Sequence, residues 1–182
     1  MLSACIGVYR RLHIVFNMTI HAYIALGSNL AGDLDCPASQ VIRAFQSIEQ
    51  LPKTRLVKQS SLYQSAAVGY LNQPDFINAV VEISTQLSPE TLLEKLLNIE
   101  HEAGRERPFA NAPRELDLDL LLYDDVIMQT KNLTLPHPRM LERGFVLLPL
   151  AEIAPDLIIP NGGNVVKLAL AHQNLGIKKL EL

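Results

Sequence analysis

The stretch ELDLDLLL, residues 115–122, carries the strongest strand pattern in the chain. Successive side chains of a strand point to opposite faces, so the leucines at even positions fall on one face, where we expect them to be buried against helices. Asp117 and Asp119 fall on the other face, about 7 Å apart by two strand rises. We therefore predict a strand over 116–123 with two carboxylates side by side.

The segments around this strand predict the fold. Hydrophobic runs predict strands and helical spacing predicts helices, in the order strand 21–26, helix 39–51, strand 56–63, strand 76–86, helix 89–103 and strand 116–123. This β-α-β-β-α-β order is that of the split-βαβ, ferredoxin-like fold. We expect an α+β domain of two to three layers, with a mainly antiparallel sheet and the helices of the split-βαβ unit on one face. A C-terminal extension follows, with helices over 142–153 and 165–172.

The composition is that of an ordinary folded domain. Of 182 residues, 48% are hydrophobic and 19% are charged, which allows a normal core and argues against disorder. A net charge of −3 without long basic runs argues against a nucleic-acid-coating protein. No apolar stretch is long enough to cross a bilayer. Cys5 and Cys36 have no metal or redox spacing, and we expect a cytoplasmic protein.

The N-terminal segment differs from the rest of the chain. Residues 1–17 lack acidic side chains, and Arg10, Arg11 and His13 interrupt an otherwise apolar stretch. A secretory signal would place its positive charge before an unbroken apolar core. We expect a poorly ordered leader without chemistry over 1–17, a natural start at Met18, and a single domain over 18–182. A targeting presequence is the alternative.

The aspartate pair lies within a cluster of arginines. Five of the nine arginines fall between positions 105 and 143, namely Arg105, Arg107, Arg114, Arg139 and Arg143. Two carboxylates suit Mg²⁺ ions that bridge phosphates, and guanidinium groups match phosphate oxygens. The pattern indicates a phosphoryl-transfer or nucleotide-binding site. The alternative is an amphipathic strand with a solvated face, surrounded by surface salt bridges.

Four other residues could complete such a site. His137, in a loop flanked by prolines, could donate a hydrogen bond to a phosphate oxygen, although a lone histidine is more often structural. Phe76 and Phe145 would by themselves be core residues. Asn78 lies on the same strand face as Phe76, and an amide beside an aromatic ring can bind the edge of a flat heterocycle. These residues do not identify the substrate.

Four ordered motifs resemble one known family. They are AYIALGSNL at 22–30, QPDFINA at 73–79, PRELDLD at 113–119 and PHPRMxxRGF at 136–145, where x marks a position outside the motif. They are similar to those of the 6-hydroxymethyl-7,8-dihydropterin pyrophosphokinases of the folate pathway, over about residues 20 to 160. The resemblance implies an enzyme that transfers the terminal diphosphate of ATP to the hydroxymethyl group of a reduced pterin and releases AMP. It implies ATP and the pterin as partners, and we expect a monomer.

The resemblance also implies residue roles. Asp117 and Asp119 would hold two Mg²⁺ ions and act in catalysis with Arg105 and Arg114. The residues expected at the pterin are Ser65, Ala66, Val68, Phe76, Asn78 and Phe145. Those expected at ATP are Glu100, Arg107, Arg114, Thr134, His137 and Arg143.

The chain departs from the family pattern in one loop. Asn111 and Ala112 stand where the family often has Trp-Gly, Pro108 stands at an often basic position, and the loop is one residue shorter. We expect an active enzyme with a weaker hold on the pterin. Two alternatives are another Mg²⁺-dependent nucleotidyl or phosphoryl transferase on the same sheet, and a binding domain without activity.

Overall fold

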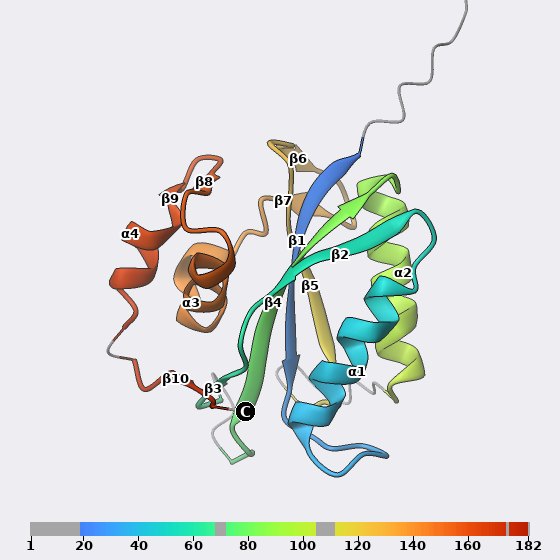
Figure 1. Ribbon diagram of the computed structural model, residues 1–182, viewed down its shortest axis with the longest axis vertical. Coiled ribbons are helices and arrows are strands. Elements are labelled where there is room, and N and C mark those ends of the chain that lie inside the picture. Colours follow the sequence, from blue (N-terminus) through green and yellow to red (C-terminus); the bar gives the residue numbers. More distant parts are fainter. Residues whose placement is uncertain (1–18, 68–71, 105–111, 174, 182) are drawn as a thin grey trace, which may run out of the picture.

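A computed structural model describes residues 19–67, 72–104, 112–173 and 175–181. It has the expected order of strands and helices (Figure 1). The ferredoxin-like part comprises β1 (Ile20–Ser28), α1 (Pro37–Glu49), β2 (Thr54–Gln59), β3 (Tyr63–Ser65), β4 (Phe76–Thr85), α2 (Pro89–Glu102) and β5 (Asp117–Tyr123). The extension comprises β6 (Met128–Gln129), β7 (Thr134–Leu135), the 3-10 helix η1 (Met140–Glu142), α3 (Gly144–Ile153), β8 (Ile158–Ile159), β9 (Gly163–Asn164), α4 (Val165–Leu170) and β10 (Lys178–Lys179). The expected leader over 1–17 lies outside the described residues.

The main sheet has the topology that the sequence predicts. Its strands lie in the order β10-β3-β4-β1-β5, and β2 also pairs with β4. Every pairing in this sheet is antiparallel. The central strands β1 and β4 pair in continuous register from Ile20 opposite Thr85 to Ser28 opposite Ile77. This arrangement confirms the split-βαβ expectation.

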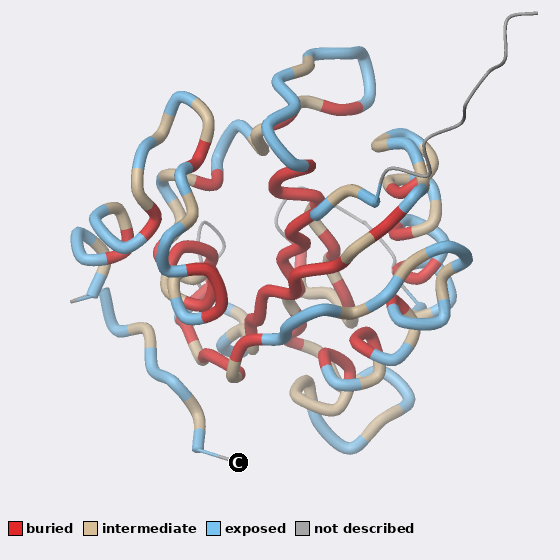
Figure 2. The backbone as a smooth tube through the Cα atoms, turned by 45° about the horizontal axis from the view of Figure 1, so that its top comes forward, coloured by how far each residue is buried: buried red, intermediate tan, exposed pale blue. Residues whose placement is uncertain are grey.

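Helices cover both faces of the sheet, in three layers. α1 and α2 lie on one face and α3 and α4 on the other (Figure 1). The two helices of the split-βαβ unit, α1 and α2, therefore share one face as expected, and the helices of the extension form the third layer. The second face is also apolar, because Tyr23, Val80 and Leu121 are buried there, and α3 packs on them. Figure 2 shows the central strands buried between these layers, while the outer loops are exposed.

β5 contains an irregularity that changes one predicted orientation. Ile24 of β1 lies opposite Leu120, but Tyr23 lies opposite Leu122, so Leu121 is an extra residue. Such a bulge shifts the alternation of side chains. Leu121 and Leu122 consequently both pack on the α3 side. The prediction that Leu122 shares a face with the earlier leucines is therefore wrong.

The helices begin with recognisable signals. The Ser88 side chain accepts a hydrogen bond from Thr91 N, and Pro89 and Glu90 occupy the first turn of α2, as the sequence predicts. α1 begins at Pro37, two positions before the predicted start, and has no side-chain cap. None of the described helices is long and apolar enough to cross a membrane.

The predicted strand over 56–63 divides into β2 and β3, which both pair with β4. The C-terminal segment then extends this edge, because β10 pairs with β3. Glu152 at the end of α3 connects this edge of the sheet to α3 through hydrogen bonds. Its carboxylate accepts hydrogen bonds from Ser61 Oγ at 2.8 Å, Tyr63 OH at 2.9 Å and Lys179 Nζ at 2.9 Å.

Glu152→Gln should lower the free energy of unfolding by about 1–2 kcal/mol at pH 7, because hydrogen bonds to a carboxylate are lost. Burial disfavours the charged carboxylate, but the hydrogen bonds from Lys179, Ser61 and Tyr63 outweigh it and lower the pKa of Glu152. A carboxyl group with a lowered pKa stabilises the folded state at pH values above its ordinary pKa. This contribution is lost as the pH falls through the lowered pKa. Urea unfolding should therefore show a smaller difference near pH 3 than at pH 7.

The exposed Asp156, in the turn after α3, provides the control for this experiment. Asp156→Asn should change the unfolding free energy little at either pH. An equal effect of Glu152→Gln at both pH values would show that the carboxylate charge is not what stabilises this edge.

Candidate active site

A cavity of about 340 Å³ opens on the α3 side of the sheet. The ends of β1, β4 and β5 form one wall, and the segment from Arg139 to Val146 forms the other. This is the sheet face onto which Asp117, Asp119 and Asn78 project, because alternate residues of each strand share a face. The cavity therefore gathers groups from strands that are distant in sequence.

The two carboxylates of β5 both line this cavity. Asp117 lies opposite Gly27 and Asp119 opposite Ala25 on the neighbouring strand. Both of these β1 residues are small, which leaves space beside the carboxylates. A Cβ atom at Gly27 would lie 3.5 Å from Asn78 Oδ1 and 3.8 Å from Phe76 Cδ1. The glycine thus keeps the floor of the cavity open.

Cationic groups surround the carboxylates. Arg143 Nη1 lies 2.8 Å from Asp119 Oδ2, and Arg114 Nη2 lies 3.4 Å from Asp117 Oδ2. Side-chain exposures of 19–30% at Arg143 and Asp119 show that this pair is partly shielded from water. Arg114 Nε is buried and makes no hydrogen bond within the described part of the chain. It is therefore a donor that a ligand could use.

His137 lies beside Asp119, with Nε2 3.7 Å from Asp119 Oδ2. Burial is the main cause that lowers the pKa of His137, and the charges of Arg143 and Arg139 add to it while Asp119 opposes. The backbone N–H of Arg139 donates to His137 Nδ1 at 3.2 Å. A neutral ring therefore carries its proton on Nε2, on the side of Asp119. His137 can act as a neutral hydrogen-bond donor there.

Two aromatic rings line the same cavity. Arg114 lies over the ring of Phe76, with 5.3 Å from the guanidinium carbon to the ring centre, and Arg143 lies over Phe145 at 5.7 Å. Asn78 is buried, and its Nδ2 donates to Ser65 Oγ at 3.0 Å. The cavity thus combines ring faces, a fixed amide and a charged region. These are features suited to a flat heterocycle joined to phosphate groups.

The carboxylate pair fits a magnesium site that uses the substrate as a ligand. No group of three acidic, histidine or cysteine side chains in the described ranges could enclose a metal ion. Mg²⁺ usually keeps several waters and binds one or two carboxylates together with substrate phosphates. Asp117 and Asp119 supply such carboxylates. The positive charges of the nearby arginines can balance the additional negative charge of phosphate groups.

The structure brings together nine of the predicted site residues, which line the cavity: Ser65, Ala66, Phe76, Asn78, Arg114, Asp117, Asp119, Arg143 and Phe145. His137 contacts Asp119 without lining the cavity. Glu100 is buried behind β5 and accepts a hydrogen bond from Leu118 N at 2.6 Å, and Thr134 lies in β7. Their nucleotide contact stays a prediction. Val68, Arg105 and Arg107 lie outside the described residues, as does Asn111.

Seven further residues line the cavity without having been predicted as site residues: Ala25, Leu26, Gly27, Gln73, Arg139, Glu142 and Val146. The first five of these belong to the motifs at 22–30, 73–79 and 136–145. Arg139 also belongs to the arginine cluster. Glu142 shows no signal of its own, because a single acidic residue beside Arg143 resembles an ordinary surface ion pair.

The fold and this combination of groups define a class, the transferases of phosphate-containing groups. A model of the family described as 7,8-dihydro-6-hydroxymethylpterin-pyrophosphokinase (HPPK) matches residues 23–155. The chain belongs to this family and is an enzyme, an ATP-dependent diphosphotransferase.

Related proteins carry the same description. The chain is 48% identical over 149 residues to the 2-amino-4-hydroxy-6-hydroxymethyldihydropteridine pyrophosphokinase of Haemophilus influenzae, covering 82% of this chain and 91% of that protein. It is 44% identical over 163 residues to the protein of the same name from Pseudomonas aeruginosa, covering 90% and 98%.

The fold is also found in solved structures. The Plasmodium falciparum HPPK-DHPS with pterin and p-hydroxybenzoate has a TM-score of 0.69 to this chain at 14% sequence identity. The comparison covers 91% of this chain and 47% of that one. The chain thus spans about half the length of the Plasmodium protein, and at this identity the similarity shows the fold alone.

Proposed function

We propose that the chain transfers the terminal diphosphate of ATP to the hydroxymethyl group of 6-hydroxymethyl-7,8-dihydropterin, giving AMP and the pterin diphosphate, in folate biosynthesis. The observation that carries this proposal is that the Phe76–Phe145 pair and the Asp117–Asp119 pair line one cavity. The names of the relatives support the pterin as substrate. A monomeric state and a cytoplasmic location stay predictions.

The reaction needs positioning more than covalent chemistry. The substrate hydroxyl oxygen attacks the β-phosphorus, a new O–P bond forms, and the bond from that phosphorus to the oxygen bridging to the α-phosphate breaks. The leaving oxygen departs with AMP, and the hydroxyl proton is released to solvent. In-line alignment and charge neutralisation supply most of the acceleration in such transfers. A covalent nucleophile on the protein is not required.

Different residues of the cavity would bind the pterin ring, the phosphate groups and the metal ions. Phe76 and Phe145 would stack on the pterin ring, and Asn78 would bind its edge. Arg114, Arg143 and the Nε2–H of His137 would contact phosphate oxygens. Two Mg²⁺ ions held by Asp117 and Asp119, when bound, would supply charge neutralisation and alignment of the phosphates.

Substrate binding should redirect the two arginines. In the structure Arg114 and Arg143 each lie over one of the aromatic rings and beside one of the carboxylates. A stacked pterin would need those ring faces, and cations would compete for those carboxylates. We infer that both guanidinium groups turn toward the phosphates as the substrates bind, because phosphate oxygens offer them stronger hydrogen bonds.

The proposal is tested by measuring AMP release from ATP and Mg²⁺ with and without 6-hydroxymethyl-7,8-dihydropterin. The expected result is AMP formation that depends on both the pterin and Mg²⁺. ATP binding without AMP formation would instead support a binding domain. AMP or ADP formation unaffected by the pterin would support a different transferase.

Phe76→Ala should raise the KM for the pterin roughly 5- to 150-fold, the range expected when one aromatic stacking partner of a base-like ring is removed. The KM for ATP should change little. Phe76→Leu, which keeps an apolar side chain, should have a smaller effect. Steady-state kinetics with each substrate varied in turn gives both values. Unchanged pterin kinetics would show that the ring binds elsewhere.

A further inference from the structure

The end of β1 carries a buried asparagine that the proposed mechanism does not use. Asn29 directly follows β1, within the GSN sequence at 27–29, and is only 2% exposed. Its side chain contacts two segments that are far apart in the sequence. One is the backbone of Arg114, ahead of β5, and the other is the turn at Gln73 and Pro74, ahead of β4.

Asn29 is held to both segments by short hydrogen bonds. On one side Arg114 N donates to Asn29 Oδ1 at 2.8 Å, and Asn29 N donates to Arg114 O at 3.1 Å. On the other side Asn29 Nδ2 donates to Gln73 Oε1 at 2.9 Å and to Pro74 O at 3.2 Å. The asparagine therefore bridges the two segments through opposite ends of one amide.

This bridge requires a carboxamide. The N–H of Arg114 can only donate and the carbonyl of Pro74 can only accept, so the group between them must accept on one side and donate on the other. Aspartate would keep the acceptor for Arg114 but place an oxygen against the Pro74 carbonyl. Leucine, of similar size, would remove the side-chain partner of both the Arg114 N–H and the Pro74 carbonyl.

The two bridged segments lead into different parts of the cavity. Arg114 lies beside Asp117, in the charged part. Pro74 lies two residues before Phe76 in the sequence. The guanidinium carbon of Arg114 lies over the ring of Phe76, 5.3 Å from the ring centre. Because both segments meet at Asn29, its amide sets the distance between the charged part and the ring.

We propose that Asn29 is a positioning residue, which aligns the ring-binding part of the cavity with its phosphate-binding part. This inference rests on the proposed function for the identity of the two ligands. Each half of the amide has its own task. The Oδ1 side places Arg114 for the phosphates, and the Nδ2 side places the turn that carries Phe76 for the ring.

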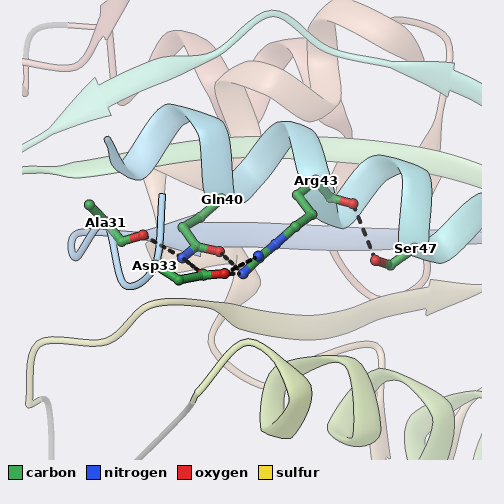
Figure 3. A network of polar contacts seen from close by, with 5 residues as sticks. All are labelled: Ala31, Asp33, Gln40, Arg43 and Ser47. Atoms are coloured by element: carbon green, nitrogen blue, oxygen red, sulfur yellow. Dashed lines mark hydrogen bonds and ion pairs between the residues drawn. The ribbon is translucent and has the colours of Figure 1, made fainter. Parts of the chain in front are cut away.

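The loop that follows Asn29 has a second anchor, which makes a matched control. Gln40 of α1 donates to Ala31 O at 2.5 Å, and Arg43 binds Asp33 with both terminal nitrogens at 2.9 Å (Figure 3). These residues hold the same loop, but none of them lines the cavity. Gln40 is also as buried as Asn29, at 1% exposure.

The test measures kcat, the KM for each substrate and the melting temperature of Asn29→Asp, Asn29→Leu and Gln40→Met. Asn29→Asp should raise the KM for the pterin about 10-fold and leave the KM for ATP and kcat within about threefold, because only the Nδ2 side is lost. Asn29→Leu should in addition lower kcat about 10- to 100-fold, the scale of a misplaced catalytic group. Gln40→Met should lower only the melting temperature.

Equal kinetic parameters for Asn29→Asp and wild type, or the same loss in Gln40→Met, would overturn the proposal. Hydrogen exchange gives a readout that needs no substrate. Asn29→Asp should increase exchange in residues 72–78 and not in 112–116, whereas Gln40→Met should change neither. If wild type makes no AMP, the proposed function fails, and the exchange pattern still decides whether Asn29 holds the two segments.

Discussion

Asp119→Ala should lower kcat by at least about 1000-fold, because a metal-binding carboxylate contributes several kcal/mol of transition-state stabilisation. Asp119 lines the cavity, faces away from Leu118 and Leu120 of β5, and lies within 4 Å of both Arg143 and His137. Its removal should leave an excess of positive charge and no ligand for Mg²⁺ at this point. AMP release at saturating substrates measures the effect.

The fold should survive this substitution. Asp119 is 30% exposed, and its partner Arg143 can turn toward solvent, so we expect a small change in melting temperature. Asp125→Asn is the matched control, since Asp125 is exposed just beyond the end of β5 and outside the cavity. It should retain full activity. A kcat above one-tenth of wild type for Asp119→Ala would refute the metal-binding role.

The strands of the central sheet were predictable because β1 and β4 are apolar runs and β5 begins with an alternation of leucine and aspartate. β1, β4 and β5 are apolar on the face toward α1 and α2, and a one-residue shift would move every buried side chain to the other face. The bulge at Leu121 was not predictable, because the four consecutive apolar or aromatic residues at 120–123 show no alternation there. The two-residue strands, such as β10, depend on distant partners and carry almost no local signal.

The types of side chain at the site could be predicted from the sequence. The contacts between the loops around the site could be predicted less well. The aspartate pair and the Phe76–Asn78 pair are each two residues apart on one strand, so their shared faces follow from the strand period. Gln73, Glu142 and the contacts of Asn29 depend on how loops meet in space. The expectation for Glu100 shows the same limit, since its buried contact with Leu118 N arises from packing of α2 against the edge of β5.

Arg114→Met should lower kcat about 100- to 1000-fold, the loss expected when one preorganised donor to developing charge is removed from a shielded site. The geometry supports a large effect. Arg114 is 23% exposed, stands beside Asp117, and has a buried Nε without a hydrogen bond in the described residues. Its backbone is fixed by Asn29 and Leu30, which both donate from N to Arg114 O. The side chain is thus presented from a rigid position.

Arg114→Lys distinguishes charge from geometry. Lysine keeps the positive charge but lacks the planar fork that binds two phosphate oxygens at once, so we expect it to recover only part of the lost activity. Full recovery would show that Arg114 acts as a point charge. Arg43→Met, which removes an arginine of α1 whose side chain binds Asp33 and lies outside the cavity, is the control and should leave kcat unchanged. A loss below about tenfold for Arg114→Met would mean that this arginine stabilises the fold, through Phe76 and Asp117, and does not contact the transferred group.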